Sequence, residues 1–346
     1  MDCFMSLKKV LFLWNIREDL KEYLNSHLSD ISELELMFTD NVEEDFTPES
    51  PHIHDADIIV GWRPSKELLQ SAQNLKLYIN PGVGVQHLID MFREVTKTRN
   101  ITLINGHGNT YFTAQSGVAL LLSLTNKIIP HHNWMIEGKW RRGDDFAKNI
   151  PLRDRTVGLL GYGAINSKVH KFLCGFKLKF AALRTSWDTK QEFPTELKQF
   201  TPDILHEFLE YVDILVVAVP LTKLTKNLIS TDELGILTRN KSALLVNISR
   251  GPVVNEQALY NSLKERQLSG AAIDVWYEYK PEPNAEGRKY PSHFPFHELD
   301  NVVLSPHRAA SPFDDLQRWC EVIENIKRFC AGKTDLLNIV DLEREY

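Results

Sequence analysis

The sequence predicts an α/β fold built on doubly wound parallel sheets, and three observations support this prediction. Short apolar runs alternate with segments of helical periodicity along most of the 346 residues, which is typical of parallel sheets. A glycine turn, Gly161-Tyr162-Gly163, follows one apolar run and precedes a helical segment. Polar residues follow three later apolar runs, at the edge of a parallel sheet where ligands usually bind.

Length and composition restrict the possible functions. A chain of 346 residues suits two domains better than one small core. The formal net charge of −6 disfavours a nucleic-acid partner held by phosphate attraction. The four cysteines form no C-x-x-C pair, so we expect neither a disulfide framework nor a metal site. No apolar run is long enough to span a membrane, and we expect a cytoplasmic protein.

The N-terminal part is expected to form the first of the sheets. Strands are predicted at residues 9–14, 57–61, 75–79 and 101–104. Leucines recur on one face of residues 18–28, which predicts a helix. A longer helix is predicted at residues 111–129, where Pro130 interrupts it. Its middle is apolar almost all round, and we therefore expect it to be buried.

The remainder of the chain repeats the alternation. Strands are predicted at residues 157–160, 179–183, 214–219, 243–247, 270–274 and 302–305. Helices are predicted at residues 164–174, 201–208, 255–265 and 314–329. This order predicts a six-stranded doubly wound sheet. Residues 280–295 contain four prolines and predict a long irregular loop.

The glycine turn has the chemistry of a pyrophosphate site. Gly161 allows a tight turn, and Gly163 allows the backbone to approach a phosphate closely. The helix that follows presents unpaired N–H groups and the positive end of its dipole. Asn166 stands where the dinucleotide fingerprint has a third glycine. The predicted cofactor contacts of this turn are Gly161, Tyr162, Gly163, Ala164 and Ile165.

Three further blocks place polar residues directly after predicted strands. These blocks are Asn247-Ile248-Ser249-Arg250-Gly251, Asp274-Val275-Trp276 and Ser305-Pro306-His307. In their order along the chain they resemble the motifs of the D-2-hydroxyacid dehydrogenases, the D-isomer-specific NAD(P)-dependent oxidoreductases. The resemblance extends from residues 80–85 to residues 338–341.

The resemblance implies both a domain organisation and an enzymatic activity. A dinucleotide-binding domain at residues 113–312 would be inserted in a smaller flavodoxin-like substrate domain, residues 1–112 and 313–346. The helix near Tyr111 and the helix after Ser311 would be hinges that close a cleft over substrate and cofactor. The activity implied is hydride transfer between NAD(P)H and a small 2-oxo acid, which gives a D-2-hydroxy acid.

Reduction of a 2-oxo acid needs a group that holds the carboxylate and a group that donates a proton. Arg250 suits the first role, because a guanidinium binds a carboxylate bidentately and keeps its charge. His307 suits the second role, because imidazole titrates near neutral pH. The family also binds substrate carboxylates through a glycine loop, here Gly82, Val83 and Gly84, for which a plain turn is the alternative.

The sequence departs from the family at the partner of the histidine. Family members usually carry a glutamate five residues after the aspartate of the second block, where it raises the pKa of the histidine. Tyr279 occupies that position here, and Glu278 precedes it. A shifted loop would make Glu278 the catalytic partner of His307. The alternatives are a neutral partner, as in formate dehydrogenases, and an exposed Glu278 without a role.

The adenosine end of the cofactor site favours NADP over NAD. Members that prefer NAD carry an acidic residue where this chain has Arg184, followed by Thr185 and Ser186. An arginine and two hydroxyls can bind a 2′-phosphate, whereas a carboxylate would repel it. A solvated Arg184 with NAD bound is the alternative. By resemblance, three further residues contact the cofactor: Pro220, Ser249 and Asp274.

Three functions remain open at this point. The first is a reductase of glyoxylate or hydroxypyruvate, and the second is a dehydrogenase of the formate or phosphite type. The third is an NAD(H)-sensing binding protein that resembles the family's transcriptional corepressors. By analogy with the family we also expect a homodimer.

Overall fold

The computed structural model describes residues 7–39, 52–141, 143, 146–187, 192–240, 242–310 and 314–346. The chain divides into two compact units. Unit 1 comprises Met1–Asn109 and Pro312–Tyr346, and unit 2 comprises Thr110–Ser311. The sequence placed the two boundaries after residues 112 and 312. The predicted hinge position Ser311 lies outside the described residues.

Unit 1 contains a parallel sheet of five strands in the order β2-β1-β3-β4-β5. The strands are β1 (Lys8–Phe12), β2 (Leu34–Phe38), β3 (Ile58–Val60), β4 (Leu77–Asn80) and β5 (Thr102–Asn105). The helices are α1 (Glu18–Leu28), α2 (Lys66–Ser71), α3 (Ile89–Val95) and α10 (Cys320–Cys330). This strand order is that of the flavodoxin-like sheet.

Alternate residues of the unit 1 strands enter two separate apolar cores. Ile59 and Tyr78 pack with α2 and α3 on one face of the sheet. Ile58 and Leu77 pack with α1 and α10 on the other face. Because neighbouring residues of a strand point to opposite faces, continuously apolar strands are what a sheet covered on both sides requires.

Unit 2 contains a parallel sheet of seven strands in the order β12-β11-β10-β9-β6-β7-β8. The strands are β6 (Thr156–Leu160), β7 (Lys179–Leu183), β8 (Lys198–Phe200), β9 (Ile214–Val217), β10 (Leu244–Asn247), β11 (Gly270–Ile273) and β12 (Val302–Leu304). The helices are α4 (Thr110–Thr125), α5 (Ile128–Ile136), α6 (Asn166–Leu173), α7 (Leu205–Tyr211), α8 (Thr231–Leu237) and α9 (Glu256–Lys264). This is the doubly wound order of a dinucleotide-binding domain with one further strand.

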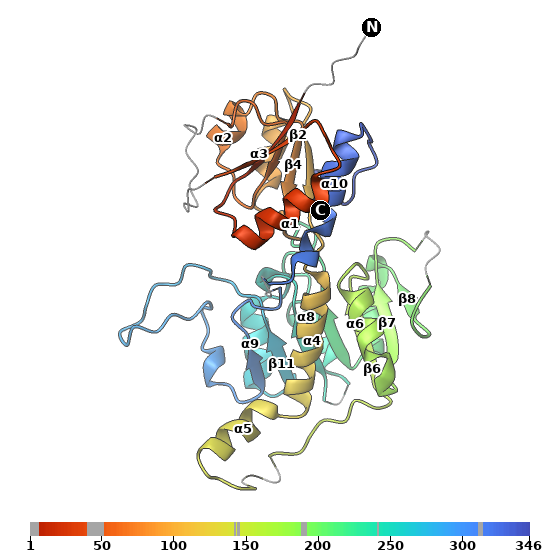
Figure 1. Cartoon of the computed structure of the whole chain (residues 1–346). Coiled ribbons are helices and arrows are strands. Elements are labelled where there is room, and N and C mark those ends of the chain that lie inside the picture. Colours follow the sequence, from red (N-terminus) through yellow and green to blue (C-terminus); the bar gives the residue numbers. More distant parts are fainter. Residues whose placement is uncertain are drawn as a thin grey trace. The chain divides into compact units, whose positions relative to one another are not determined.

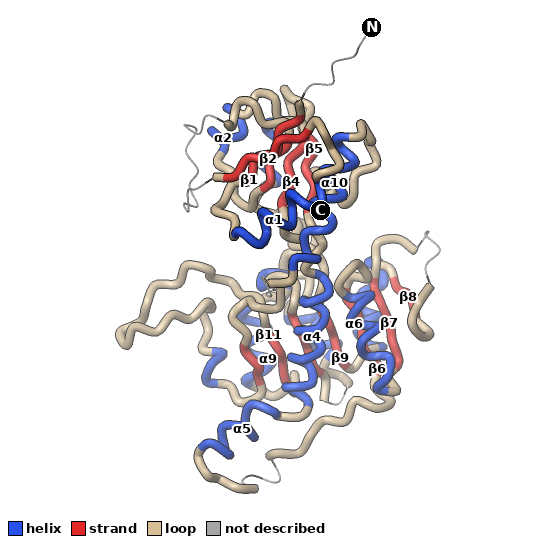
Figure 2. Tube along the Cα trace, viewed as in Figure 1, coloured by secondary structure: helices blue, strands red, loops and turns tan. Residues whose placement is uncertain are grey.

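Helices cover both faces of the unit 2 sheet (Figures 1 and 2). Helices α4 and α6 pack on one face with Ile214 and Val216 of β9. Helices α7, α8 and α9 pack on the other face with Leu215 and Val217. The ends of β6, β10, β11 and β12 therefore meet at one edge of a sheet that is buried on both faces.

Several elements differ from the sequence prediction. The predicted six-stranded sheet has seven strands, because the short edge strand β8 was missed, and β2 and helices α2, α3 and α8 were missed as well. The predicted helix at residues 111–129 ends at Thr125, and Lys127 adopts a left-handed φ of 50°. Pro130 lies in the first turn of α5, where its missing N–H costs no helical hydrogen bond.

Among the helices of the described ranges, none is both long and apolar enough to cross a bilayer.

Candidate active site

The glycine turn after β6 is closed on its inner side and open on its outer side. Gly161 has a φ of +82°, and a Cβ placed there would lie 2.7 Å from Cγ1 of Val219. Only glycine therefore fits this position without strain. A Cβ on Gly163 would meet no atom within 4 Å. The turn thus leaves room for a group that approaches its backbone from outside.

Asn166, which stands in place of the third glycine, stabilises this turn through hydrogen bonds of its side chain. Its side chain is fully buried. The Nδ2 group donates hydrogen bonds to the carbonyl oxygens of Leu160 (3.2 Å), Gly161 (2.7 Å) and Val216 (3.3 Å). The amide therefore joins the ends of β6 and β9, and the departure from the fingerprint strengthens the turn instead of disrupting it.

The backbone around the start of α6 offers hydrogen-bond donors. Within the described residues, the N–H groups of Gly163, Ala164 and Ile165 donate no hydrogen bond. Unpaired N–H groups at a helix N-terminus favour an anion. These three donors and the open side of Gly163 fit the pyrophosphate of a dinucleotide.

The side chain of Tyr162 points away from this surface, into the interior of unit 2. Its hydroxyl is 2.9 Å from Nδ1 of His170, and Nε2 of His170 is 2.8 Å from Oγ1 of Thr195. Burial lowers the pKa of His170 to about 4 and raises the pKa of Tyr162 to about 12. Both groups are therefore neutral near pH 7, and only the backbone of Tyr162 remains for a cofactor.

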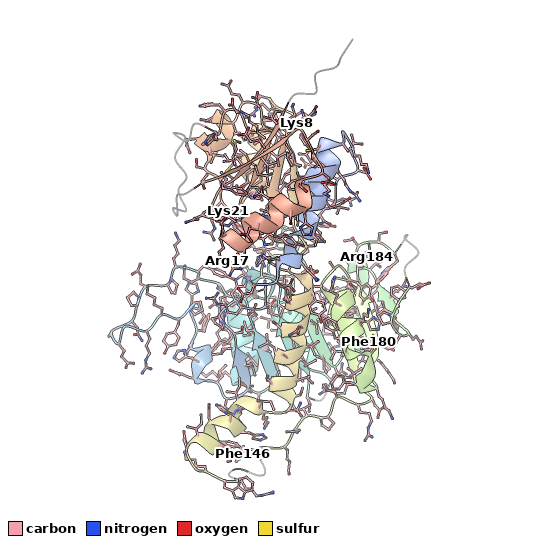
Figure 3. The ribbon with its side chains drawn as sticks, in the orientation of Figure 1. Lys8, Arg17, Lys21, Phe146, Phe180 and Arg184 are labelled. Carbon is pink, nitrogen blue, oxygen red and sulfur yellow. The ribbon has the colours of Figure 1, made fainter. Side chains whose placement is uncertain are left out.

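Arg184 follows the end of β7, next to the glycine turn on β6 (Figure 3). Its Cζ atom lies 5.9 Å from the centre of the Trp187 ring, and Nε1 of Trp187 donates a 2.9 Å hydrogen bond to the carbonyl of Phe200. Thr185 and Ser186 are exposed beside it. A guanidinium and two hydroxyls thus occupy the same edge of the sheet as the turn.

Ser249 and Pro220 belong to two chain segments that are joined to each other. The hydroxyl of Ser249 donates a hydrogen bond to the carbonyl of Val219. The carbonyl of Pro220 accepts a 2.6 Å hydrogen bond from Oγ1 of Thr225. The Ser249 hydroxyl is therefore engaged within the protein, whereas Pro220 is exposed at the rim.

Asp274 organises the chain after β12. Its carboxylate is almost completely buried, with an exposed fraction of 1%. It accepts hydrogen bonds from Oγ of Ser305 (2.5 Å), N–H of Arg308 (2.8 Å) and N–H of Ala309 (3.2 Å). These bonds fix the turn at His307, which adopts a left-handed φ of 55°. Strain of this kind persists only where surrounding contacts enforce it.

The charge of Arg250 acts on the imidazole of His307 at this edge of the sheet. Burial and the positive charge of Arg250 both lower the pKa of His307. Burial also lowers the pKa of Arg250, which Asp274 and Tyr279 partly oppose. Among the described residues, no hydrogen bond engages the imidazole of His307. The guanidinium of Arg250 donates one bond, from Nη1 to the carbonyl of Ser249 (2.7 Å).

The structure does not bring Glu278 to His307. Its carboxylate accepts a 2.7 Å hydrogen bond from the N–H of Lys280. Its charge acts on His293, whose pKa is raised mainly by a hydrogen bond to Glu256. The ring of Tyr279 lies instead beside His307, with 5.4 Å between the ring centres and an angle of 60° between the planes.

The loop at Gly82, Val83 and Gly84 lies in unit 1 and is built on two buried amides. Nδ2 of Asn80 donates to the carbonyls of Gly82 (2.5 Å) and Gly84 (3.3 Å). Nδ2 of Asn105 donates to the carbonyl of Val83 (2.7 Å). Because the carbonyls turn inward, the N–H groups of the loop remain without a partner among the described residues, an arrangement that suits an anion.

Comparison with known proteins identifies the family. Residues 118–309 match the NAD binding domain of the D-isomer specific 2-hydroxyacid dehydrogenases. The chain belongs to this family. It is 35% identical to a glyoxylate reductase of Thermofilum pendens over 261 residues, which cover 74% of this chain and 72% of that protein. It is 32% identical to a glyoxylate reductase of Pyrococcus horikoshii, with 78% of each chain covered.

Solved structures show that the dehydrogenase has the family's fold. A D-isomer specific 2-hydroxyacid dehydrogenase from Xanthobacter autotrophicus, in complex with NADPH and MES, matches with a TM-score of 0.76 and 24% identity. That match covers 99% of this chain and all of the other. An NADPH-dependent glyoxylate/hydroxypyruvate reductase from Sinorhizobium meliloti, in complex with NADP and sulfate, matches with a TM-score of 0.76 and 21% identity, covering 98% of this chain and all of the other.

The dehydrogenase is thus an NAD(P)-dependent oxidoreductase that acts on the CH–OH group of 2-hydroxy acids. Its glycine turn fits the dinucleotide by its open outer side and its unpaired N–H groups. Sequence reasoning placed Tyr279 at the position of the family's glutamate and left a neutral partner of His307 open, but it did not predict the contact between the two rings. It missed the buried hydrogen bond between Tyr162 and His170, which depends on tertiary packing and which no motif marks.

Proposed function

We propose that this dehydrogenase is an NADPH-dependent reductase of small 2-oxo acids, with glyoxylate or hydroxypyruvate as substrate and a D-2-hydroxy acid as product. The observation that carries the proposal is the effect of Arg250 on His307: together with burial, the positive charge of Arg250 lowers the pKa of His307. An anion with an adjacent carbonyl complements a guanidinium beside an imidazole. The relatives named glyoxylate reductase support the same substrate class.

Each residue has a defined task in this reaction. Arg250 binds the substrate's carboxylate and polarises the carbonyl oxygen as negative charge develops there. His307 donates a proton to that oxygen, which becomes the hydroxyl of the product. When bound, the reduced nicotinamide supplies the hydride that C2 of the substrate accepts. Asp274 keeps His307 in position through the turn that it fixes.

The cofactor preference rests on the end of β7. Arg184 is placed there with Thr185 and Ser186, and a 2′-phosphate would gain charge-assisted hydrogen bonds from them. The N–H groups of Gly163, Ala164 and Ile165 would receive the pyrophosphate. The loop at residues 82–84 is a further candidate for binding an anion, because its carbonyls bond to the amides of Asn80 and Asn105 and its N–H groups have no partner among the described residues.

The proposal is tested by following oxidation of NADPH and NADH with a panel of 2-oxo acids, and by running the reverse reaction on formate and phosphite. Arg250→Gln and His307→Gln should each lower kcat/KM with glyoxylate about 10³-fold. Arg266→Gln is the matched control, because Arg266 is exposed and pairs with Asp300 on the surface. Dinucleotide binding without turnover of any substrate would favour the corepressor-like alternative.

The exposed apolar arm of unit 2 suggests how a homodimer would form. Helix α5 and the segment after it project beyond the sheet of unit 2, where Figure 3 labels Phe146. The most exposed apolar side chains of this arm are Ile136 (71%), Trp140 (74%) and Phe146 (78%). Large apolar side chains that are exposed on one segment are typical of an interaction site. We expect light scattering to show a dimer, and Ile136→Lys with Trp140→Glu to yield a monomer.

A further inference from the structure

Among the residues that the structure describes, no carboxylate forms a hydrogen bond or ion pair with the imidazole of His307, whereas a proton donor usually has such a partner. Four titratable or charged groups act on it or contact it within unit 2: Arg250, Asp274, Tyr279 and Arg308. Two of these are cationic and disfavour a second positive charge on the imidazole. Only Asp274 favours that charge, and it comes third in importance after burial and Arg250.

Asp274 cannot serve as a direct partner for the imidazole. Its buried carboxylate already accepts hydrogen bonds from Ser305, Arg308 and Ala309. Both oxygens are engaged, so turning the carboxylate toward His307 would leave buried donors unpaired. Asp274 therefore acts on His307 only at a distance and through the backbone of the turn.

Tyr279 fills the place beside the imidazole with a neutral group. Its hydroxyl accepts a 3.3 Å hydrogen bond from the N–H of Trp276, and its ring contacts His307 edge to face. Burial raises the pKa of the Tyr279 phenol, which therefore carries no charge near neutral pH. About half of the side chain is exposed (52%), so the position tolerates substitution.

We propose that the substrate's own carboxylate, bound by Arg250, supplies the missing negative charge, so that His307 takes up a proton from the solvent as the anion binds. This inference rests on the proposed function, because it assigns the anion to Arg250. The proton comes from water and is bound by the free imidazole nitrogen. It is then passed to the carbonyl oxygen, while the hydride from the reduced cofactor forms the C–H bond at C2, and His307 is left neutral again.

The physical cause is the loss of repulsion at Arg250. In the absence of an anion, the guanidinium opposes a positive charge on His307. A bound carboxylate neutralises the guanidinium and adds an attractive charge next to the imidazole. Binding of the anion and binding of the proton then strengthen each other by the same factor. The affinity for the anion should fall about tenfold per pH unit above neutrality.

The test counts the protons that are taken up when an unreactive anion binds. Oxamate is added to the purified protein saturated with NADPH. A pH-stat then records how much acid must be added to hold the solution at pH 7.5. The carboxyl group of oxamate is ionised throughout, so it takes up no proton itself. We expect uptake to approach about one proton per bound oxamate. Oxamate binding without uptake would overturn the inference.

Variants identify the group that receives the proton. His307→Gln should still bind oxamate through Arg250 while uptake falls close to zero. Tyr279→Glu places a carboxylate beside His307, so the imidazole is protonated in advance, and uptake at pH 7.5 should fall at least twofold. The matched variant Tyr279→Phe keeps the ring and adds no charge, and its uptake should equal that of the unmodified protein.

The outcomes separate this inference from the proposed function. Uptake that persists in His307→Gln, or that is unchanged in Tyr279→Glu, contradicts the inference even if 2-oxo acids are reduced. Uptake that depends on His307 in a protein that reduces no 2-oxo acid contradicts only the proposed function. Failure of oxamate to bind at both pH 6 and pH 7.5 contradicts the assignment of the anion to Arg250 and therefore both.

Discussion

The two functional regions of unit 2 lie on the same sheet edge, yet they are built in opposite ways. At the glycine turn, Tyr162, His170 and Thr195 bond to one another in the interior, and the surface offers backbone N–H groups. After the ends of β10 and β12, Arg250 and His307 present their side chains, and the positive charge of Arg250 disfavours protonation of His307. The first region forms its hydrogen bonds without a ligand, whereas in the second region no carboxylate of the described residues is hydrogen-bonded to His307.

This difference shows how one fold serves a bound cofactor and a reacting substrate. A cofactor that is held through many turnovers suits a rigid cradle of backbone donors, which need no change of protonation. A proton donor must change its charge in every cycle, and its surroundings must therefore allow both states. Four experiments test this difference between the two regions.

Removing the Asp274 carboxylate should have the largest effect. Asp274→Ala leaves the hydroxyl of Ser305 and two backbone N–H groups without their acceptor. We expect the free energy of unfolding of unit 2 to fall by about 3–5 kcal/mol, and kcat/KM to fall at least about 10²-fold, because the turn at His307 is released. Urea unfolding and steady-state kinetics measure these effects. Asp300→Ala, at an exposed ion pair, should change stability by less than about 0.5 kcal/mol.

Acid should destabilise the network under the glycine turn. The pKa of His170 is lowered to about 4 in the folded protein, so the unfolded chain binds more protons between pH 4 and pH 6.5. Stability is fully present above pH 6.5 and should fall by about 3 kcal/mol as the pH drops through this window. Urea midpoints between pH 4 and pH 8 test this. His170→Gln should make stability nearly independent of pH in this window, whereas His52→Gln, at an exposed site, should leave the pH dependence unchanged. The same pH dependence in His170→Gln and in the unmodified protein would refute the role of His170.

The two glycines of the turn should respond differently to the same substitution. Gly161→Ala forces a methyl group against Val219 in a left-handed backbone and should cost about 1–3 kcal/mol of folding free energy. Gly163→Ala meets no neighbouring atom and should change stability by less than about 0.5 kcal/mol. It should nevertheless weaken NADPH binding about tenfold, because the methyl group occupies the approach to the backbone. Thermal unfolding and NADPH titration separate the effects, and equal losses of stability would contradict this description of the turn.

The smallest effect concerns cofactor preference at Arg184. Arg184→Asp should reduce the ratio of NADPH to NADH affinity about fivefold, because a carboxylate repels the 2′-phosphate. Lys179→Asp makes the same charge change at the opposite end of β7 and should leave the ratio unchanged. Titrations with both cofactors measure the ratio. A parallel loss of NADPH and NADH affinity would show that Arg184 does not distinguish them.

Much of the fold could be predicted because its strands are continuously apolar. Strands such as Ile214–Val217 and Leu244–Asn247 are buried on both faces. A short apolar run between helical segments is therefore typical of a strand in such a sheet. The missed strands are edge strands. Lys198–Phe200 buries only one of its three residues, so its composition resembles that of a loop.

The parallel α/β architecture and the chain positions of the glycine turn, Arg250 and His307 follow from the amino-acid sequence alone. Burial patterns and residues that follow strands are local properties, and a linear chain records them. The neighbour of the imidazole could be identified only from the tertiary structure. A shift of one residue, from Glu278 to Tyr279, leaves a neutral ring instead of a carboxylate beside His307, and this depends on loop packing, which no periodicity encodes.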